Sequence, residues 1–272
     1  MASHAAREDV NKTMVKRILA GSILALILVG CGGSGGDTGT SFGFGVNACP
    51  NVGALSITAN GNLVLNSAAY SASSSAFVGI NAGTNAAIFL TNAASTQLAS
   101  GSTTFTASDY YTIYALGNAI NQYVFVYPTD VSSPASGFGK LILVNASVLQ
   151  PSVDVYVTLT GNTQGAPVIT SMTPFNSGVE TPTPLAVGTY DVQFKVAGTS
   201  TVLVDEPSVT IGSTPATNEI QIIAIADAQT GSATLQQALP VLPIPVIAGA
   251  TAPRTMGHPV VVGHPEMTRF PK

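Results

Sequence analysis

The first pattern along the chain is an alternation of apolar and polar positions with a period of two. It is clear at residues 55–58, 153–160 and 202–204, and such alternation gives a β-strand one apolar and one wetted face. Asn60-Gly61 separates two apolar runs, which predicts a tight hairpin turn. Further turn signals recur at short spacing, at 82–84, 100–102, 160–162 and 187–189. This spacing favours a β-sandwich or barrel over alternating helices and strands.

A second pattern is an internal repeat. Three pairs of segments align at shifts that grow along the chain, namely 45–58 with 143–156 (98), 82–89 with 187–194 (105) and 111–116 with 221–226 (110). A growing shift predicts loop insertions in the second copy, which we place at 162–183 and 205–218. Each copy is then about 90 to 100 residues long, the size of an immunoglobulin-like module.

These patterns predict an all-β chain with two tandem immunoglobulin-like, antiparallel β-sandwiches, at residues 42–134 and 135–238. The next strand begins close to the joint at 129–134, so we expect the two modules to touch. From residue 239 prolines recur, at Pro240, Pro243 and Pro245. Proline lacks the backbone donor that a sheet interior needs, so residues 239–272 are predicted to be a proline-rich, unstructured tail.

The N-terminal region has the organisation of an export signal. Lys16 and Arg17 precede an uncharged apolar run at residues 18–30, which has the length of a signal-peptide core. A transmembrane helix needs about 20 apolar residues to cross roughly 30 Å of hydrocarbon, so this run is too short. We predict a signal peptide at residues 1–30, with Met14 as the initiator and residues 1–13 as an upstream extension.

The end of this run resembles the bacterial lipobox, because Leu28-Val29-Gly30 precede Cys31. The resemblance implies cleavage before Cys31, lipidation of its thiol and attachment to a lipid bilayer through at least two acyl chains. Two or more chains hold a protein stably on a bilayer, whereas one binds reversibly. Glycine-rich residues 31–41 are predicted to form a flexible tether.

Composition supports export and excludes one class of partner. Only 8% of the residues are charged, where about 25% is usual, and this argues against a helical cytoplasmic enzyme. The net charge is −4. Removal of residues 1–30 takes away a net +2 and leaves −6, so the mature chain has no basic surface to neutralise phosphates and we expect no nucleic-acid binding.

Cysteine and histidine offer little chemistry. Once Cys31 is lipidated, Cys49 is the only other cysteine, so no intrachain disulfide can form, and we expect Cys49 to be a buried, inert thiol. The predicted modules contain no histidine, which rules out a Ser-His-Asp triad there. His258 and His264 lie in the tail, and two ligands do not complete a zinc site. We predict no metal, cofactor or catalytic residue.

Carboxylates and aromatics leave alternatives open. A carboxylate pair could be drawn from a set in the second module, namely Glu180, Asp191, Asp205, Glu206, Glu219 and Asp227. Neighbouring strand residues point to opposite faces, however, which makes Asp205 and Glu206 poor partners. A calcium site at the sandwich ends is a further alternative, although no Asp-x-Asp-x-Asp loop is present. Tyr123, Phe125 and Tyr127 share one face and either close the module interface or offer a sugar-stacking platform.

The assembled motifs resemble the bacterial domain-of-unknown-function family 4397. The resemblance rests on four elements of the second module, at residues 144–147, 153–157, 187–190 and 221–224. The first module departs from the family at residues 54–57, where Ala-Leu-Ser-Ile replaces Val-Asp-Val-Tyr. The resemblance implies two tandem copies on a cell-envelope lipoprotein. It implies no established activity and no site residues.

We therefore expect a non-enzymatic, membrane-anchored binding, adhesion or structural module with a protein or glycan ligand. In a Gram-negative cell it would sit at the outer membrane or periplasmic face, and in a Gram-positive cell at the outer face of the cytoplasmic membrane. The alternatives are an envelope hydrolase that uses carboxylates and a self-assembling envelope subunit.

Overall fold

The computed structural model describes residues 39–150, 152–174, 177–180, 184–212, 220–229, 236–238, 242–244 and 260–263. For residues 177–180 and those beyond 229 it describes the backbone alone. All regular elements among these residues are β-strands, which confirms the predicted all-β class. In this part of the chain there is no helix with the length and apolar character needed to cross a membrane.

The first β-domain consists of two sheets. Its outer sheet has the strand order β3 (Asn62–Ala68), β2 (Leu55–Ala59), β5 (Gly83–Asn92) and β6 (Gln97–Phe105). Its inner sheet has the order β19 (Val260–Gly263), β8 (Gln122–Pro128), β7 (Tyr110–Gly117), β1 (Thr40–Asn47) and β4 (Val78–Asn81). The predicted hairpin is confirmed, because Ala59 pairs with Asn62 and Asn60 and Gly61 both have positive φ angles, of 44° and 80°.

The second β-domain has the same two-layer plan. Its inner sheet has the order β12 (Ser177–Glu180), β9 (Phe138–Asn145), β16 (Ile220–Asp227) and β17 (Gln236–Ala238), with β13 (Leu185–Ala186) paired to β9 and β18 (Leu242–Ile244) paired to β16. Its outer sheet has the order β11 (Ile169–Met172), β10 (Val153–Leu159), β14 (Gly188–Val196) and β15 (Val202–Ile211).

Both inner sheets are mixed, and the prediction of purely antiparallel sheets was wrong. Strand β1 pairs with β7 in parallel, and β9 pairs with β16 in parallel. In each domain the chain leaves the first inner strand for the outer sheet and returns later beside it, running the same way. An alternating pattern reports which face of a strand is buried, but it carries no information about the direction of the neighbouring strand.

The pairing scheme recurs between the domains. The parallel register Phe42↔Tyr110 of the first domain has its counterpart in Lys140↔Ile220 of the second, at the sequence shifts of 98 and 110. The shift of 105 holds where β5 and β14 begin, at Gly83 and Gly188. Beyond that point a bulge at Asn85, which has a positive φ of 53°, adds one residue to β5.

The bulge corrects one detail of the sequence alignment, which set Phe89 against Phe194. Leu90 faces Ile57 across the first outer sheet, and Phe194 faces Val155 across the second. Leu90 and Phe194 are both buried, whereas Phe89 is half-buried on the opposite face of its strand. Because side chains alternate along a strand, one inserted residue reverses every side chain that follows.

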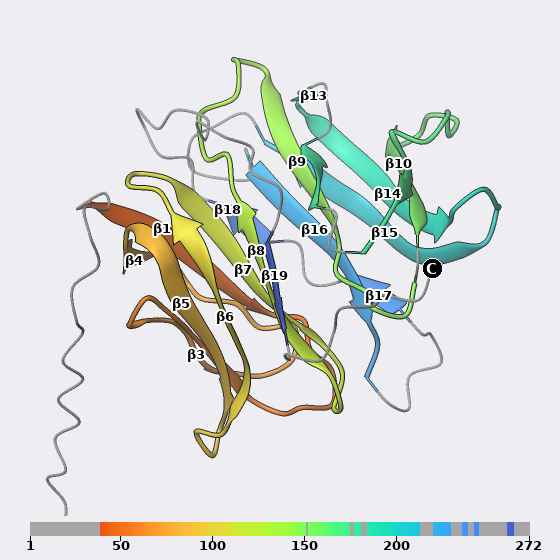
Figure 1. Cartoon of the computed structure of the whole chain (residues 1–272). Coiled ribbons are helices and arrows are strands. Elements are labelled where there is room, and N and C mark those ends of the chain that lie inside the picture. Colours follow the sequence, from red (N-terminus) through yellow and green to blue (C-terminus); the bar gives the residue numbers. More distant parts are fainter. Residues whose placement is uncertain are drawn as a thin grey trace, which may run out of the picture. The chain divides into compact units, whose positions relative to one another are not determined.

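Three apolar cores separate four layers of sheet (Figure 1). One core fills the first domain, between its outer and inner sheets, and another fills the second domain in the same way. The third core, which we call the central core, lies between the two inner sheets and draws on both domains. It includes Tyr114 and Phe125 from the first domain and Ile142 and Ile222 from the second.

The sequence explains why the inner strands lie in the middle. Strands β8 (QYVFVYP) and β16 (IQIIAIAD) are apolar at nearly every position, and β16 is buried along its whole length. Strands with continuous apolar runs are those buried on both faces. Strand β2 of the outer sheet instead alternates between buried and half-buried positions, as expected for a sheet with one face in solvent.

Residues beyond 238, for which the sequence predicts no regular structure, contribute two short strands. Strand β18 pairs with β16 of the second domain, and β19 pairs with β8 of the first. Short antiparallel additions of this kind satisfy backbone donors and acceptors at a sheet edge. His258 and His264 lie outside the described residues.

Two contacts show that the inner strands of both domains start at the same end. Lys140, near the start of β9, binds Asp130, which follows β8. At the other end of the strands, the Tyr70 hydroxyl donates to the backbone oxygen of Asp227, the last residue of β16 (2.7 Å). We call the end at which β1 begins, beside Gly39, the proximal end, and the opposite end the distal end.

Candidate functional site

The candidate site is a pair of loops at the distal end, one from each domain. The first loop, residues 118–121, joins β7 to β8, and the second, residues 146–150, follows β9. Each loop is organised by a side chain that accepts hydrogen bonds from the loop's own backbone. Each also exposes one large aliphatic side chain, Ile120 (84% exposed) and Leu149 (58% exposed).

Asp227 shapes the loop of the second domain. Its carboxylate accepts hydrogen bonds from the backbone N–H groups of Val148 (3.0 Å) and Leu149 (3.3 Å), and from the Ser147 hydroxyl. The Ser147 oxygen in turn accepts from the backbone N–H of Gln150 (3.1 Å). Asp227 is only 3% exposed, so this network is shielded from water and holds the loop in one conformation.

Burial also shifts the acidity of Asp227. Loss of solvent raises the pKa of its carboxyl above the ordinary value, and this effect outweighs the three hydrogen bonds from Ser147, Val148 and Leu149, which lower it. The hydrogen-bond donors thus hold the carboxylate in place, while burial makes its charged form less favourable. Such a group acts here as a structural acceptor at the end of β16.

Asn118 shapes the loop of the first domain that joins β7 to β8. Its side-chain oxygen accepts hydrogen bonds from the backbone N–H groups of Ile120 (2.9 Å) and Asn121 (3.0 Å). The preceding Gly117 has a φ of +108°, and a Cβ there would lie 2.0 Å from the Asn121 carbonyl oxygen. Only glycine can make this close turn, which lifts Ile120 into solvent.

Two asparagines anchor the equivalent loops that follow β1 in the first domain and β9 in the second. The Asn47 side-chain oxygen accepts from the Cys49 N–H (3.0 Å), and the Asn145 side-chain oxygen accepts from the Ser147 N–H (3.1 Å). Both side-chain amides donate to a backbone oxygen, of Ala68 (2.9 Å) or Met172 (3.1 Å). Sequence reasoning missed this role, although the repeated Asn-Ala pair at a shift of 98 was a signal for it.

The two domains differ where Ser147 and Asp227 meet. The positions equivalent to these residues in the first domain, at shifts of 98 and 110, are Cys49 and Gly117. Cys49 is buried and not in a disulfide, which confirms the expectation of a buried thiol. Burial, and to a smaller degree the charge of Asp227, raises the pKa of Cys49 to about 12, so the reactive thiolate is scarce near neutral pH.

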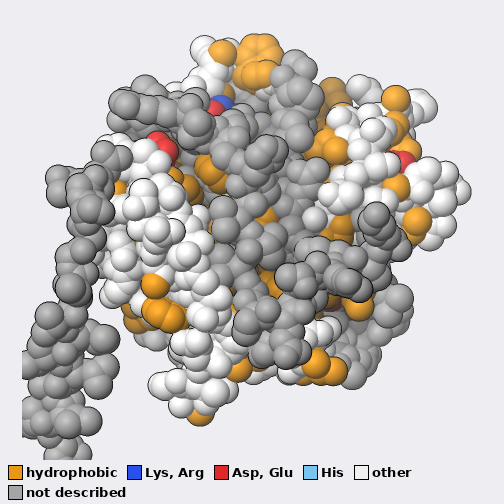
Figure 2. Space-filling model, viewed as in Figure 1, with side chains coloured by type: hydrophobic (Ala, Val, Ile, Leu, Met, Phe, Trp, Pro, Cys, Tyr) orange, Lys and Arg blue, Asp and Glu red, His pale blue; other side chains and the backbone are white. Residues whose placement is uncertain are grey.

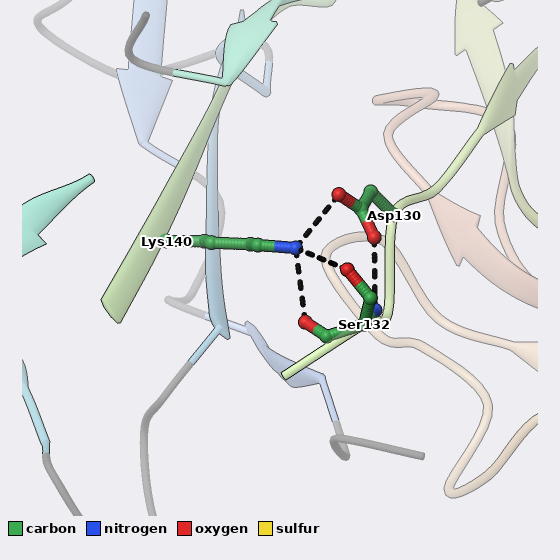
Figure 3. Close-up of polar contacts among 3 residues, drawn as sticks. All are labelled: Asp130, Ser132 and Lys140. Atoms are coloured by element: carbon green, nitrogen blue, oxygen red, sulfur yellow. Dashed lines mark hydrogen bonds and ion pairs between the residues drawn. The ribbon is translucent and has the colours of Figure 1, made fainter. Parts of the chain in front are cut away.

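A polar lock joins the domains at the proximal end (Figure 3). The Lys140 ammonium donates to the Asp130 carboxylate (2.7 Å), to the Ser132 backbone oxygen (2.9 Å) and to the Ser132 hydroxyl (2.9 Å). Burial alone would raise the pKa of Asp130, but hydrogen bonds from Lys140 and Ser132 outweigh it and lower that pKa. The linker between the domains is therefore pinned to β9.

Replacing Lys140 by methionine should lower the free energy of unfolding by about 2 kcal/mol, because the largely buried Asp130 carboxylate loses its cation. Urea unfolding followed by circular dichroism measures the loss. The matched control is Lys195→Met, since Lys195 is half-exposed and its Nζ lies 4.3 Å from the centre of the Tyr156 ring. The control should lose less than about 1 kcal/mol. Equal losses in both variants would contradict the role assigned to the lock.

The described carboxylates that the sequence left open as an acid–base pair lie on two different sheets. Asp191, Asp205 and Glu206 lie on the second outer sheet, whereas Asp227 lies on the inner sheet. Burial, followed by the neighbouring charge of Asp205, raises the pKa of Glu206. Among the residues with described side chains, no three His, Cys, Asp or Glu are grouped to hold a metal ion. Glu219, the Glu180 side chain and the predicted lipidation site Cys31 lie outside the described part.

The aromatic row of β8 closes the domain interface. Tyr123, Phe125 and Tyr127 are all buried in the central core, and the Phe125 and Tyr114 rings lie 6.2 Å apart. This confirms the interface alternative. A sugar-stacking platform needs exposed ring faces, so that alternative was wrong.

No curated protein matches the chain. A family model described as "Domain of unknown function (DUF4397)" matches residues 45–156. The match runs from β1 through the first β-domain and the linker into β10. The description names neither an activity nor a ligand. The chain thus contains one DUF4397 domain, at residues 45–156.

Proposed function

We propose that this protein is a lipid-anchored, non-enzymatic binding protein of the cell envelope, which presents its distal loops to a protein partner. The observation that carries the proposal is the display of Ile120 (84% exposed) and Leu149 (58% exposed) on two internally hydrogen-bonded loops at the distal end. The chain enters the fold at the other end, at Gly39 and Thr40. An anchor before this point would therefore attach to the end of the fold opposite the distal loops.

The anchor rests on the sequence around Cys31. A basic pair, an apolar run of signal-peptide length and small residues before the cysteine together favour cleavage and acylation there. Two acyl chains would hold the protein stably in the bilayer. The low charge of the chain and a cysteine with no described disulfide partner agree with this location.

The architecture supports a finer assignment, that the second β-domain is a second copy of the first and that both are immunoglobulin-like. Each domain pairs its first inner strand in parallel with a late strand, and each pairs the first strand of its outer sheet in antiparallel fashion with a later outer strand. The loop-anchoring asparagines Asn47 and Asn145 recur at the same place. Such recurrence is typical of a duplicated module.

The chemistry of the loop tips favours a protein partner over a glycan. Ile120 and Leu149 are branched aliphatic side chains that bury well in an apolar pocket, whereas sugars stack on aromatic rings. The loops are held by Asn118 and Asp227, so little conformational freedom is lost on binding. The central core joins both domains, so the two tips are presented by domains that pack against each other.

The test is photo-crosslinking in cells that export the full-length protein, with a photoreactive amino acid at position 120 or 149. We expect one discrete crosslinked protein band at both positions and none at the control position Leu63, which is also aliphatic, is 48% exposed and lies beside the Asn60-Gly61 turn at the opposite end of the strands. The Cys31→Ser variant serves as the anchor control. It should incorporate no labelled palmitate and should lose the crosslink, because the protein leaves the membrane.

Three outcomes would overturn the proposal. Equal crosslinking at Leu63 would remove the special role of the distal tips. A product with twice the chain mass would assign self-assembly instead. Binding to a glycan array that is lost in the Ile120→Ser/Leu149→Ser variant would assign a sugar ligand.

A further inference from the structure

The proximal end carries its own set of exposed apolar side chains. Four of the exposed large hydrophobic residues lie at this end, namely Leu63 (48%), Phe138 (40%), Leu159 (42%) and Val187 (41%). Hydrophobic side chains gather at the upper edge of Figure 2, where β9 begins. We call these four residues the apolar foot. Exposed apolar residues that cluster at one end of a domain mark a contact surface.

Three members of the apolar foot are neighbours in the second domain. Phe138 begins β9 and pairs with Ala186, and the adjacent Val187 donates its N–H to the Gly137 oxygen (3.0 Å). A methyl carbon of Leu159 lies 2.9 Å from the point where Gly188 would carry a Cβ. These side chains therefore form one apolar surface at the starts of β9 and β14.

Leu63 extends the foot to the first domain, beside the point at which the chain enters the fold. It follows the Asn60-Gly61 turn, and the Asn60 side chain donates to the Asn81 oxygen (2.8 Å). Asn81 pairs with Thr40, the first residue of β1. The hairpin tip and the end of the tether thus lie together.

The length of the tether limits how far this end can lie from a bilayer. Eight residues follow Cys31 up to Gly39, and a fully extended chain of that length spans at most about 28 Å. A flexible glycine-rich chain of this length spans roughly 16 Å on average. If Cys31 is acylated, as the proposed function requires, the proximal end is held at or near the headgroups.

We propose that the apolar foot contacts the lipid surface and enters the boundary between headgroups and acyl chains. The foot supplies a second attachment and orients the strands away from the membrane. The attraction is apolar rather than electrostatic, because the described residues include only two lysines, Lys140 and Lys195, and no arginine. Lys140 is bound by Asp130, so the contact does not require anionic lipids.

The test measures the depth of single labelled cysteines in the full-length, acylated protein. Phe138→Cys and Val187→Cys are labelled with an environment-sensitive fluorophore and placed in phosphatidylcholine vesicles that contain nitroxide lipids. The matched control is Val202→Cys, which has a similar exposure of 45% but lies where β15 begins, at the distal end. The native Cys49 is buried and its raised pKa keeps it unlabelled.

We expect quenching at positions 138 and 187 to exceed that at 202 about threefold or more, because an interfacial side chain sits roughly 5–10 Å below the surface. Equal quenching at the three positions, or stronger quenching at 202, would overturn the proposal. Circular dichroism of each variant verifies the fold, and Leu63→Cys gives an independent measurement from the first domain.

Mass spectrometry of the same preparation separates this proposal from the proposed function. A bare Cys31 thiol, or a retained leader, would refute the lipid anchor and with it the foot. An acylated Cys31 combined with unquenched labels at 138 and 187 would refute the foot alone and leave the anchored binding protein in place.

Discussion

Replacing Phe125 by alanine should lower the free energy of unfolding by about 3–5 kcal/mol and should weaken both domains together. Phe125 is fully buried in the central core, which contains residues of both inner sheets. Its removal leaves a cavity between β8 of the first domain and the facing strands of the second. Chemical unfolding gives the loss, and hydrogen exchange of β7 and β16 reports each domain separately. The chain has no tryptophan, so circular dichroism follows the transition.

The matched control is Phe194→Ala, because Phe194 is equally buried but lies in the core of the second domain alone. It should cost a similar free energy and should raise exchange first in β10 and β14. In the Phe125→Ala variant the amides of β7 and β16 should both exchange faster. If exchange in β16 stays unchanged in that variant, the domains are not coupled through the central core.

Replacing Asp227 by alanine should lower the free energy of unfolding by about 2–3 kcal/mol, since the buried Ser147 hydroxyl and two part-buried backbone N–H groups lose their acceptor. Asp227→Asn should cost less, about 1 kcal/mol, because its side-chain oxygen still accepts from one backbone N–H. Asp205→Ala is the control at an exposed carboxylate and should change stability by less than about 0.5 kcal/mol. Urea unfolding at neutral pH gives all three values. An Asp227→Ala substitution that leaves the free energy of unfolding unchanged would refute the assigned loop network.

The pH dependence of Asp227→Asn provides a second readout, with a defined sign. The pKa of Asp227 is raised in the folded state from its ordinary value of 3.8, so the folded protein binds this proton more tightly than the unfolded chain does. Stability from this group is therefore lost as the pH rises from about 4 through the folded-state pKa. The asparagine variant lacks this loss, and its stability relative to the native protein should improve over that rise. A constant difference between pH 4 and 8 would contradict the assignment.

Much of the fold was predictable from local sequence. The alternation at residues 55–58 and 153–160 identified β2 and β10, and Asn60-Gly61 identified the hairpin between β2 and β3. These succeed because side-chain direction along a strand and positive φ in a turn are local properties. The parallel pairing of β1 with β7 was not predictable, since no local property of either strand records its neighbour's direction.

The candidate site was harder to predict than the fold. Ser147 and Asp227 meet from positions 80 residues apart, and only Ser147 lies in a segment that the sequence singled out. The burial of Tyr123, Phe125 and Tyr127 also depended on a second domain packing against their face. Asp227 illustrates the difficulty, because the sequence left it open only as one member of a carboxylate pair, whereas the structure shows it accepting hydrogen bonds from the loop backbone.

By itself the sequence determined the all-β class, the turn at Asn60-Gly61 and the burial of Cys49, because each follows from the residue types nearby in the chain. Tertiary structure alone decided that the two inner sheets share a central core, that Asn118 and Asp227 hold the distal loops, and that the residues of the apolar foot lie at the proximal end. These features arise where residues far apart in sequence meet, and their energy comes from the exclusion of water between surfaces. No local pattern contains that information.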